Sequence, residues 1–207
     1  MHAETDRRKA AVIVAHPDDE IIWCGGLILG NLNWDWSVVC LCRSGDADRA
    51  PKFRAVCDQL GLAGAIHDVD DGNPLAHINP RRDIGDVIAG DLGAVHWDLC
   101  LTHGANGEYG HPRHKQVHRQ VLRLVREGVL RCGEFRTFSY RGDAASGRCA
   151  IARGANITID LSADDFARKK NLVRDTYGYA DDSFEVRSCL AVEGFRVWPH
   201  VGEVDRP

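Results

Sequence analysis

Short apolar runs alternate with amphipathic stretches along the first two thirds of the chain. The runs that we predict to be strands are 10–15, 37–42, 65–69 and 98–102. Most of them are almost continuously apolar, which is typical of strands buried on both faces of a parallel sheet. Helical patterns separate them, near 20–32, 49–60, 80–93 and 112–128. This alternation predicts a doubly wound α/β fold, a Rossmann-like three-layer α/β/α sandwich around a mostly parallel sheet.

The pattern loosens after about residue 134. Apolar runs at 134–140 and 150–161 predict further strands, and 163–177 predicts a last helix. We expect these strands to extend the sheet or to cover one of its edges. No internal repeat, linker or low-complexity segment interrupts the chain, so we predict one domain over residues 1–207.

Composition excludes several classes of partner. The chain has 207 residues, 44% of them hydrophobic and 27% charged, and its net charge is −4. No cluster of Lys or Arg stands out, so we expect neither nucleic acid nor an anionic membrane as a partner. The polar stretch 1–9 lacks the apolar region of a signal peptide, and no run is long enough to span a membrane. A cytoplasmic location is therefore expected.

Cysteine usage supports the same expectation. Of the eight cysteines, five lie inside apolar runs: Cys24, Cys40, Cys42, Cys57 and Cys100. There is no CxxC pair, and the spacing fits no zinc ribbon. Buried, reduced thiols that pack as small hydrophobic side chains are expected rather than a disulfide framework.

Two polar clusters follow predicted strands. The sequence HPDDE occupies 16–20 after the first strand, and 103–114 follows the strand at 98–102. In an open α/β sheet, ligands bind beyond the carboxyl ends of the strands. The two clusters, although far apart in the sequence, are therefore expected on the same rim, with the active site.

Both clusters offer metal ligands. A catalytic zinc site needs three protein ligands, and zinc favours His nitrogen and carboxylate oxygen. His16 and Asp19 are three residues apart across a strand-to-helix turn, where Pro17 suits the first helical position. The second cluster places His114 and His118 on one helix face.

Simpler interpretations exist for each cluster alone. Asp18, Asp19 and Glu20 could satisfy the free amides and the dipole at the start of a helix. His114 and His118 could belong to a solvated helix face. The occurrence of both clusters on one rim favours the metal site.

Two motifs carry a resemblance to a known family. AHPDDE at 15–20 and GHPxH at 110–114 resemble the LmbE-like (PIG-L) family of zinc-dependent N-deacetylases. Supporting segments are CRSGD at 42–46, an Arg49–Gly61 helix pattern, DDGN at 70–73 and EGFRV at 193–197. The resemblance thus runs through most of the chain.

The resemblance implies a metal centre and a base. The implied ligands are His16, Asp19 and His114, which would bind Zn²⁺; Fe²⁺ or Co²⁺ is also compatible with two histidines and one carboxylate. Asp18 corresponds to the general base of the family. It would take a proton from the water that attacks the acetyl carbonyl.

The resemblance also implies roles around the reacting carbonyl. Tyr109 and His111 match positions that stabilise the oxyanion, and His111 is a candidate to protonate the departing amine. Arg49 and Asp71 match positions that bind the substrate.

Three departures from the family pattern affect these expectations. Arg113 stands where the family often has an Asp, and Lys52 replaces an acid. The segment TYGYA at 176–180 replaces a late His-x-Ser-Gln. None of these removes an implied metal ligand, so we expect activity and leave the specificity open.

The implied function is a zinc-dependent hydrolase that removes an N-acetyl group from an amino sugar such as an N-acetylglucosaminyl compound. Its partner would be a small N-acylated amino sugar or conjugate; the sequence does not indicate an oligomeric state. An amidase acting on a thiol-sugar conjugate is an alternative. Two other classes are a non-catalytic sugar- or metal-binding module and a nucleotide-binding Rossmann protein. The glycines of CGGLILG at 24–30 have the wrong spacing for the latter.

Overall fold

The computed structural model describes residues 7–71 and 78–198. The sequence predicts no signal peptide in the polar stretch 1–9, and most of this stretch lies outside the described residues. Gly72 and Asn73 of the DDGN segment also lie outside them. Within the described ranges, no helix combines the length and apolar character needed to cross a bilayer.

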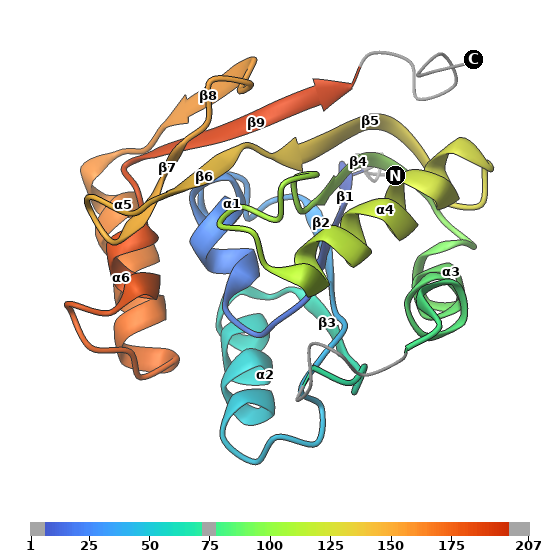
Figure 1. The fold of residues 1–207 in the computed structure, drawn as a ribbon, viewed down its shortest axis with the longest axis horizontal. Coiled ribbons are helices and arrows are strands. Elements are labelled where there is room, and N and C mark those ends of the chain that lie inside the picture. The colour runs from blue at the N-terminus through green and yellow to red at the C-terminus, as the bar shows by residue number, and fades with distance from the viewer. Residues whose placement is uncertain (1–6, 72–77, 199–207) are drawn as a thin grey trace, which may run out of the picture.

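The described chain builds a seven-stranded sheet in the order β3-β2-β1-β4-β5-β9-β8 (Figure 1). Its strands are β1 (Lys9–Val14), β2 (Asp35–Cys40), β3 (Ala63–Ile66), β4 (His96–Thr102), β5 (Arg131–Phe138), β8 (Ile157–Asp160) and β9 (Val192–Trp198). The first five strands in this order are parallel, and β9 runs antiparallel to both of its neighbours. The predicted mostly parallel sheet is confirmed.

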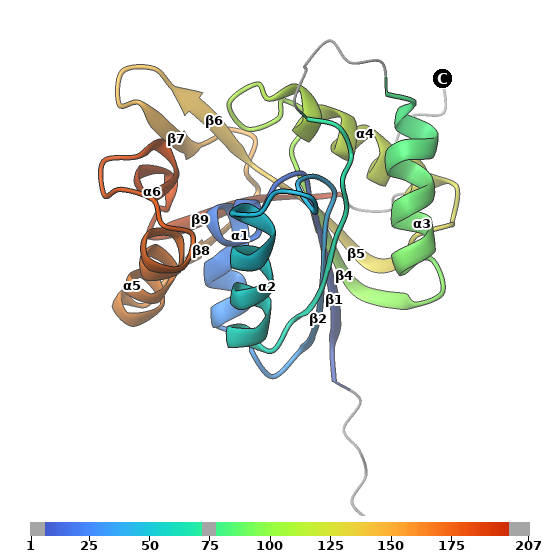
Figure 2. The same cartoon turned by 90° about the horizontal axis from the view of Figure 1, so that it is seen from below.

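Helices cover both faces of the sheet (Figure 2). One layer contains α1 (Asp19–Leu29), α2 (Arg49–Leu60), α5 (Ala163–Asn171), η2 (Leu172–Thr176) and α6 (Phe184–Ser188). The other contains η1 (Arg81–Asp86), α3 (Val87–Leu92) and α4 (Pro112–Arg126). The predicted three-layer α/β/α sandwich is therefore confirmed.

β1 lies in the middle of the core. Residues 10–15 are all fully buried, and their side chains alternate between the two layers. The even-numbered residues of 10–14 join the core beneath α1 and α2, whereas the odd-numbered residues of 11–15 join the core beneath α3 and α4. This period of two explains why the strand is apolar at every position.

The later part of the chain differs in detail from the prediction. Residues 150–151 do not extend the main sheet, because β7 (Arg148–Ile151) pairs with β6 (Tyr140–Asp143) in a separate two-stranded sheet. β8 alone, within the predicted strand 150–161, joins the main sheet, by pairing with β9. The last predicted helix changes at residue 172 from the α-helical α5 to the wider turns of η2. All eight cysteines are free thiols, as predicted.

A buried ion pair fixes a bend in α1. The helix departs from helical geometry at Cys24, whose φ is −144°. The N–H groups of Gly26 and Leu27 after the bend donate to the carboxylate of Glu193, at 2.7 and 2.9 Å. Lys169 lies 2.6 Å from the same carboxylate, and both side chains are fully buried. These two amides are thus satisfied within the chain rather than by a nucleotide phosphate.

We expect Glu193→Ala to lower the free energy of unfolding by about 3–5 kcal/mol, because it leaves the Lys169 ammonium buried without its partner. Urea denaturation followed by circular dichroism measures this loss. Glu127→Ala, which removes an exposed pairing with Arg123 on α4, is the matched control and should cost less than about 1 kcal/mol. Equal losses in the two variants would contradict the prediction.

Candidate active site

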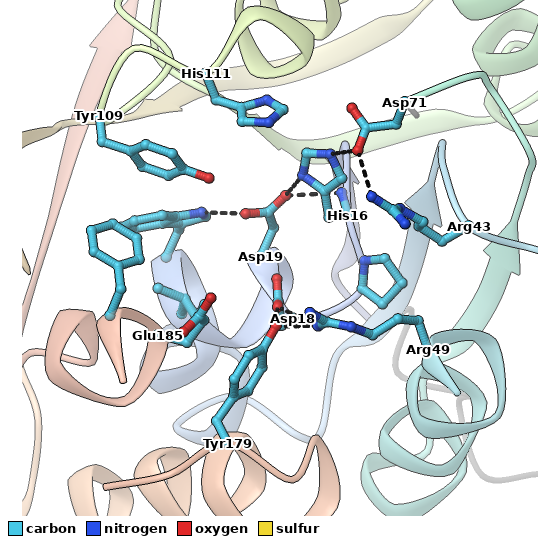
Figure 3. A pocket seen from close by; sticks show the side chains of 14 residues that line it. His16, Asp18, Asp19, Arg43, Arg49, Asp71, Tyr109, His111, Tyr179 and Glu185 are labelled. Atoms are coloured by element: carbon cyan, nitrogen blue, oxygen red, sulfur yellow. Dashed lines mark hydrogen bonds and ion pairs between the residues drawn. The ribbon is translucent and has the colours of Figure 1, made fainter. Parts of the chain in front are cut away.

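A cavity of about 210 Å³ opens at the carboxyl ends of the parallel strands (Figure 3). It lies beside the point where the chain order of the strands reverses, between β1 and β4, which is where open α/β sheets bind ligands. This is the rim on which the sequence predicts the site. The lining residues are His16, Pro17, Asp18, Asp19, Ile22, Trp23, Arg43, Arg49, Asp71, Tyr109, His111, Tyr179, Phe184 and Glu185.

Three side-chain atoms converge behind this cavity. His16 Nδ1 lies 3.1 Å from His114 Nε2, and each of these nitrogens lies 3.3 Å from Asp19 Oδ2. A tetrahedral zinc ion with ligand bonds of about 2.0–2.1 Å holds its ligand atoms about 3.3–3.4 Å apart. The three predicted ligands therefore fit three corners of such a site.

Neighbouring groups offer other combinations of ligand atoms. Metal-compatible clusters also include His16 with His111 and His114, Asp19 with His103 and His114, and His16 with Cys42 and Asp71. In the last cluster Arg43 lies 3.1 Å from Asp71 and already supplies a positive charge. The cluster of Asp19, His103 and His114 has the same donor types as the triangle, but both ring nitrogens of His103 already have hydrogen-bond partners, Ala15 N–H at 2.9 Å and Glu108 at 2.9 Å. His16, Asp19 and His114 each keep one atom for a cation, and two imidazoles with one carboxylate suit zinc.

Each side chain of the triangle has a hydrogen-bond partner on its other polar atom. These partners are Trp23 for Asp19 (2.7 Å), Asp71 for His16 (3.0 Å) and Glu108 for His114 (2.6 Å). Metal-binding histidines commonly donate their second ring N–H to a carboxylate, which fixes the ring and its tautomer. The surroundings of the triangle are thus of the kind found around metal ligands.

Ionised groups behind the cavity stabilise one another. Burial opposes the charge of Asp19, but His114 and His103 hold the pKa of this carboxyl well below its usual range. Burial would lower the pKa of His114, whereas Asp19 and Glu108 raise it to about 10. Burial likewise opposes the charge of Glu108, yet His103 and His114 lower its pKa to about 2. The cluster therefore favours positive charge at the place where a cation would bind.

Asp18 has an unusual backbone and a buried carboxylate. Its φ is 112°, a strained value for a residue with a side chain, and its N–H donates to Glu20 at 3.1 Å. Its side chain makes no hydrogen bond to the helix that follows, so the interpretation as a helix cap is wrong for Asp18. Glu20, buried and bonded to Tyr177, holds this backbone in place.

Two side chains contact the same oxygen of Asp18. The Arg49 guanidinium lies 3.0 Å from Oδ2, and the Tyr179 hydroxyl also donates to Oδ2. Burial and the nearby Asp19 raise the pKa of Asp18 to about 7, although Tyr179 and Arg49 act in the opposite direction. A carboxylate with a pKa near neutrality is suited to accept and return a proton.

His111 and Tyr109 lie on the opposite side of the cavity (Figure 3). His111 precedes α4, and its Nδ1 accepts a hydrogen bond from the Arg113 N–H at 3.2 Å. A neutral ring therefore carries its proton on Nε2. Burial and the neighbouring His114 lower the pKa of His111 to about 4, so the ring is neutral at pH 7. The Tyr109 hydroxyl points toward the cavity.

The two residues implied to bind substrate have contacts within the site. Arg49 lines the cavity but contacts Asp18. Asp71 contacts His16 and Arg43, and the hydrogen bonds from these partners, with the charge of His16, lower its pKa to about 2 against the effect of burial. Arg113 is buried and donates to the Asp70 carbonyl, so it does not supply the carboxylate that the family often places there.

Several residues at the site lie in segments that the sequence singles out but received no role there. His103 and Glu108 are buried beside His114, and Arg43 and Tyr179 line the cavity. The spacing of Trp23, one helical turn after Asp19, could have indicated the hydrogen bond between these two side chains.

His118 is buried, and its Nδ1 donates to the His103 carbonyl at 2.8 Å, so the interpretation as a solvated helix face is wrong for His118.

Comparison with known proteins places the chain in a family. A sequence model of the PIG-L family, described as GlcNAc-PI de-N-acetylase, matches residues 11–125, more than half of the chain. The chain belongs to this family. The resemblance seen in AHPDDE and GHPxH is confirmed.

Curated relatives support this assignment. A 1D-myo-inositol 2-acetamido-2-deoxy-alpha-D-glucopyranoside deacetylase of Corynebacterium diphtheriae is 31% identical over 157 residues, which cover 58% of this chain and 53% of that protein. The protein of the same name from Actinosynnema mirum is 24% identical over 187 residues, covering 72% of this chain and 66% of its own. The chain thus spans half to two thirds of the length of these relatives.

Solved structures share the fold at low sequence identity. N,N'-diacetylchitobiose deacetylase from Pyrococcus horikoshii superposes with a TM-score of 0.70 and 17% identity, over 94% of this chain and 85% of that chain. A 4-carboxy-2-hydroxymuconate hydratase from Pseudomonas putida gives a TM-score of 0.66 with 15% identity, over 95% and 99%. The same fold thus carries at least two chemistries, and function must be argued from the site.

If the triangle binds the metal, zinc binding depends on its members. We expect the purified chain to retain one zinc ion after dialysis against metal-free buffer, and Asp19→Ala and His114→Ala to lose it, because each removes one of three ligands. Elemental analysis of the dialysed proteins measures the content. His67→Ala, which removes an imidazole paired with Asp91 away from the cavity, is the control and should retain zinc. Stoichiometric zinc in Asp19→Ala or His114→Ala would rule out this ligand set.

Proposed function

We propose that this protein is a metal-dependent hydrolase that removes the N-acetyl group from an amino sugar, with His16, Asp19 and His114 as the metal ligands. The observation that carries the proposal is the convergence of these three side chains behind one cavity, whose wall contains His16, Asp19 and the buried carboxylate of Asp18. Membership of the PIG-L family and the names of the curated relatives support the same reaction.

The metal ion is proposed to be zinc. When bound, such an ion polarises a carbonyl oxygen and lowers the pKa of water from about 16 to about 7. The protein holds the three ligands in place through Trp23, Asp71 and Glu108. Fe²⁺ and Co²⁺ suit the same donors.

Asp18 is assigned as the general base. Its Oδ2 is held by Arg49 and Tyr179, which leaves Oδ1 to accept the proton of the attacking water. The carbonyl carbon then carries four substituents, and its oxygen becomes negatively charged. When the C–N bond breaks, the amine must gain a proton, and protonated Asp18 is the group that holds one.

His111 is assigned to stabilise the oxyanion that forms on the carbonyl oxygen. Its ring is neutral at pH 7 and presents the Nε2–H, so it donates a hydrogen bond where the negative charge develops. A neutral imidazole has no spare proton, which assigns protonation of the amine to Asp18 rather than to His111. Tyr109 is a second donor, because burial raises its pKa above the ordinary value and keeps the hydroxyl protonated.

The substrate is proposed to be a small N-acetylglucosaminyl compound. The cavity is partly lined by the aromatic side chains of Trp23, Tyr109 and Phe184, and sugar rings present apolar faces that pack on such surfaces. The curated relatives are named for a 2-acetamido-2-deoxy-glucopyranoside of inositol. Cleavage of an amide in a thiol-sugar conjugate would use the same residues and is the alternative.

A substrate screen tests the proposed reaction. The zinc-loaded protein is incubated with N-acetylglucosamine, its inositol and chitooligosaccharide glycosides and an N-acylated thiol-sugar conjugate, and free amine and acetate are measured. Equal amounts of amine and acetate are expected from at least one N-acetylated sugar. If the protein binds zinc but hydrolyses none of these amides, the proposed enzymatic activity is contradicted and a non-catalytic binding module is favoured.

Asp18→Asn separates base catalysis from metal binding. We expect kcat to fall by about 10²- to 10⁴-fold, because the amide cannot accept the proton of water, while zinc content stays at one per chain. Steady-state kinetics and elemental analysis measure the two quantities. An unchanged kcat would remove Asp18 from the mechanism.

Arg49→Lys and Tyr179→Phe distinguish two roles for these residues. If they hold Asp18, we expect kcat to fall about 10-fold or more and KM to change little, because charge-assisted hydrogen bonds to the base are lost. If Arg49 binds the sugar instead, as the resemblance implies, KM rises while kcat is kept. Arg54→Lys, on the exposed side of α2, is the matched control and should leave both constants unchanged.

A further inference from the structure

Glu108 lies between two buried imidazoles. Its Oε2 is 2.6 Å from His114 Nδ1 and 2.9 Å from His103 Nδ1, and its Oε1 accepts the Gly104 N–H at 2.7 Å. The two rings stack with centroids 3.8 Å apart. All three side chains are almost completely buried. The role assigned above to Glu108 concerns His114 alone and leaves the contact of the same oxygen with His103 unexplained.

Hydrogen bonding determines where the protons lie. The backbone N–H of Ala15 donates to His103 Nε2 at 2.9 Å, so this nitrogen carries no proton. Neutral His103 therefore has its proton on Nδ1 and donates it to Glu108. His114 directs Nε2 into the ligand triangle, so its proton also lies on Nδ1 and points to Glu108. The carboxylate then accepts three hydrogen bonds and needs no proton of its own.

The backbone of this loop is shaped to place the carboxylate. Glu108 has a φ of 56°, in the left-handed region that residues with side chains seldom adopt. At Gly104, a Cβ would come within 2.6 Å of the Phe138 carbonyl oxygen, so only glycine allows the approach that brings its N–H to Glu108. The strained backbone of Glu108 and the close approach of Gly104 to Phe138 are thus maintained by the hydrogen bonds of the Glu108 carboxylate.

We propose that Glu108 is the positioning residue of the metal centre, anchoring the ligand His114 and joining it, through His103, to the end of β1 that carries the ligand His16. The Glu108–His103–Ala15 chain of hydrogen bonds links the loop before α4 to β1. This chain of hydrogen bonds fixes the positions of His16 and His114, which are distant in the sequence, relative to each other. The anionic partner also makes the His114 ring a stronger donor to a cation. The inference rests on the ligand set of the proposed function but not on the reaction.

Zinc affinity of Glu108→Gln tests the proposal. Competition between the protein and a chromophoric chelator for Zn²⁺ alone, with no substrate present, gives the dissociation constant. We expect binding about 10- to 100-fold weaker than in the unmodified chain, because the amide loses the charge and keeps only one acceptor oxygen. Glu127→Gln, at the exposed end of α4, is the matched control and should bind zinc as tightly as the unmodified chain. Circular dichroism and the melting temperature check that each variant is folded.

Nuclear magnetic resonance of the unmodified zinc-loaded chain gives a second test, which does not depend on the folding of a variant. Two Nδ1-bound protons, from His103 and His114, should resonate far downfield and exchange slowly, because both are buried and bonded to a carboxylate. Zinc bound through His114 Nδ1, or an affinity of folded Glu108→Gln within twofold of the unmodified chain, would overturn the proposal, as would an unmodified chain that binds no zinc. A chain that binds zinc through Glu108-anchored His114 but hydrolyses no amide would refute the proposed function alone.

Discussion

Burial of negative charge at the end of β1 is the constraint on which the site depends. Asp18, Asp19 and Glu20 are consecutive and almost excluded from solvent, and an unpaired buried carboxylate would cost several kcal/mol. Each of the three carboxylates is stabilised by different partners. Asp19 faces a group of imidazoles, Asp18 faces Arg49 and Tyr179, and Glu20 is bonded to Tyr177 and to the backbone of Asp18. A divalent cation in the ligand triangle would complete the balance for Asp19.

The topology of the sheet makes this arrangement available. β1 and β4 are adjacent and parallel, so His16 and the loop that leads to His114 on α4 leave the sheet at the same rim. Hydrogen bonds then tie the two segments together: Ala15 to His103, and His103 to Glu108. Residues 11–125 contain the whole proposed ligand set, whereas Tyr179, Phe184 and Glu185 reach the cavity from outside the part matched to the family. The chemistry and the outer wall of the cavity thus come from different parts of the chain.

Sequence patterns predicted the parallel strands because these depend on local periodicity, whereas the resemblance implied the ligand set, whose three side chains the fold brings together. β1 is apolar at every position, and His16 and Asp19 are close in the sequence. The separate β6–β7 sheet depends on tertiary pairing and was not predicted. Side-chain partners were predicted least well. The substrate-binding roles that the resemblance implies for Asp71 and Arg49 stay predictions. Their contacts with His16 and Asp18, and those of Glu108 with His114, gave no signal because they depend on the folded loops.

The central claim is that one cation binds between His16, Asp19 and His114. X-ray absorption spectroscopy of the zinc-loaded protein measures this most directly, because it reports the type and distance of the atoms bound to the metal. Two imidazole nitrogens and a carboxylate oxygen at about 2.0–2.2 Å, with no sulfur, are expected. A zinc–sulfur distance of about 2.3 Å would contradict the claim, since it would move the ion to the cluster that contains Cys42.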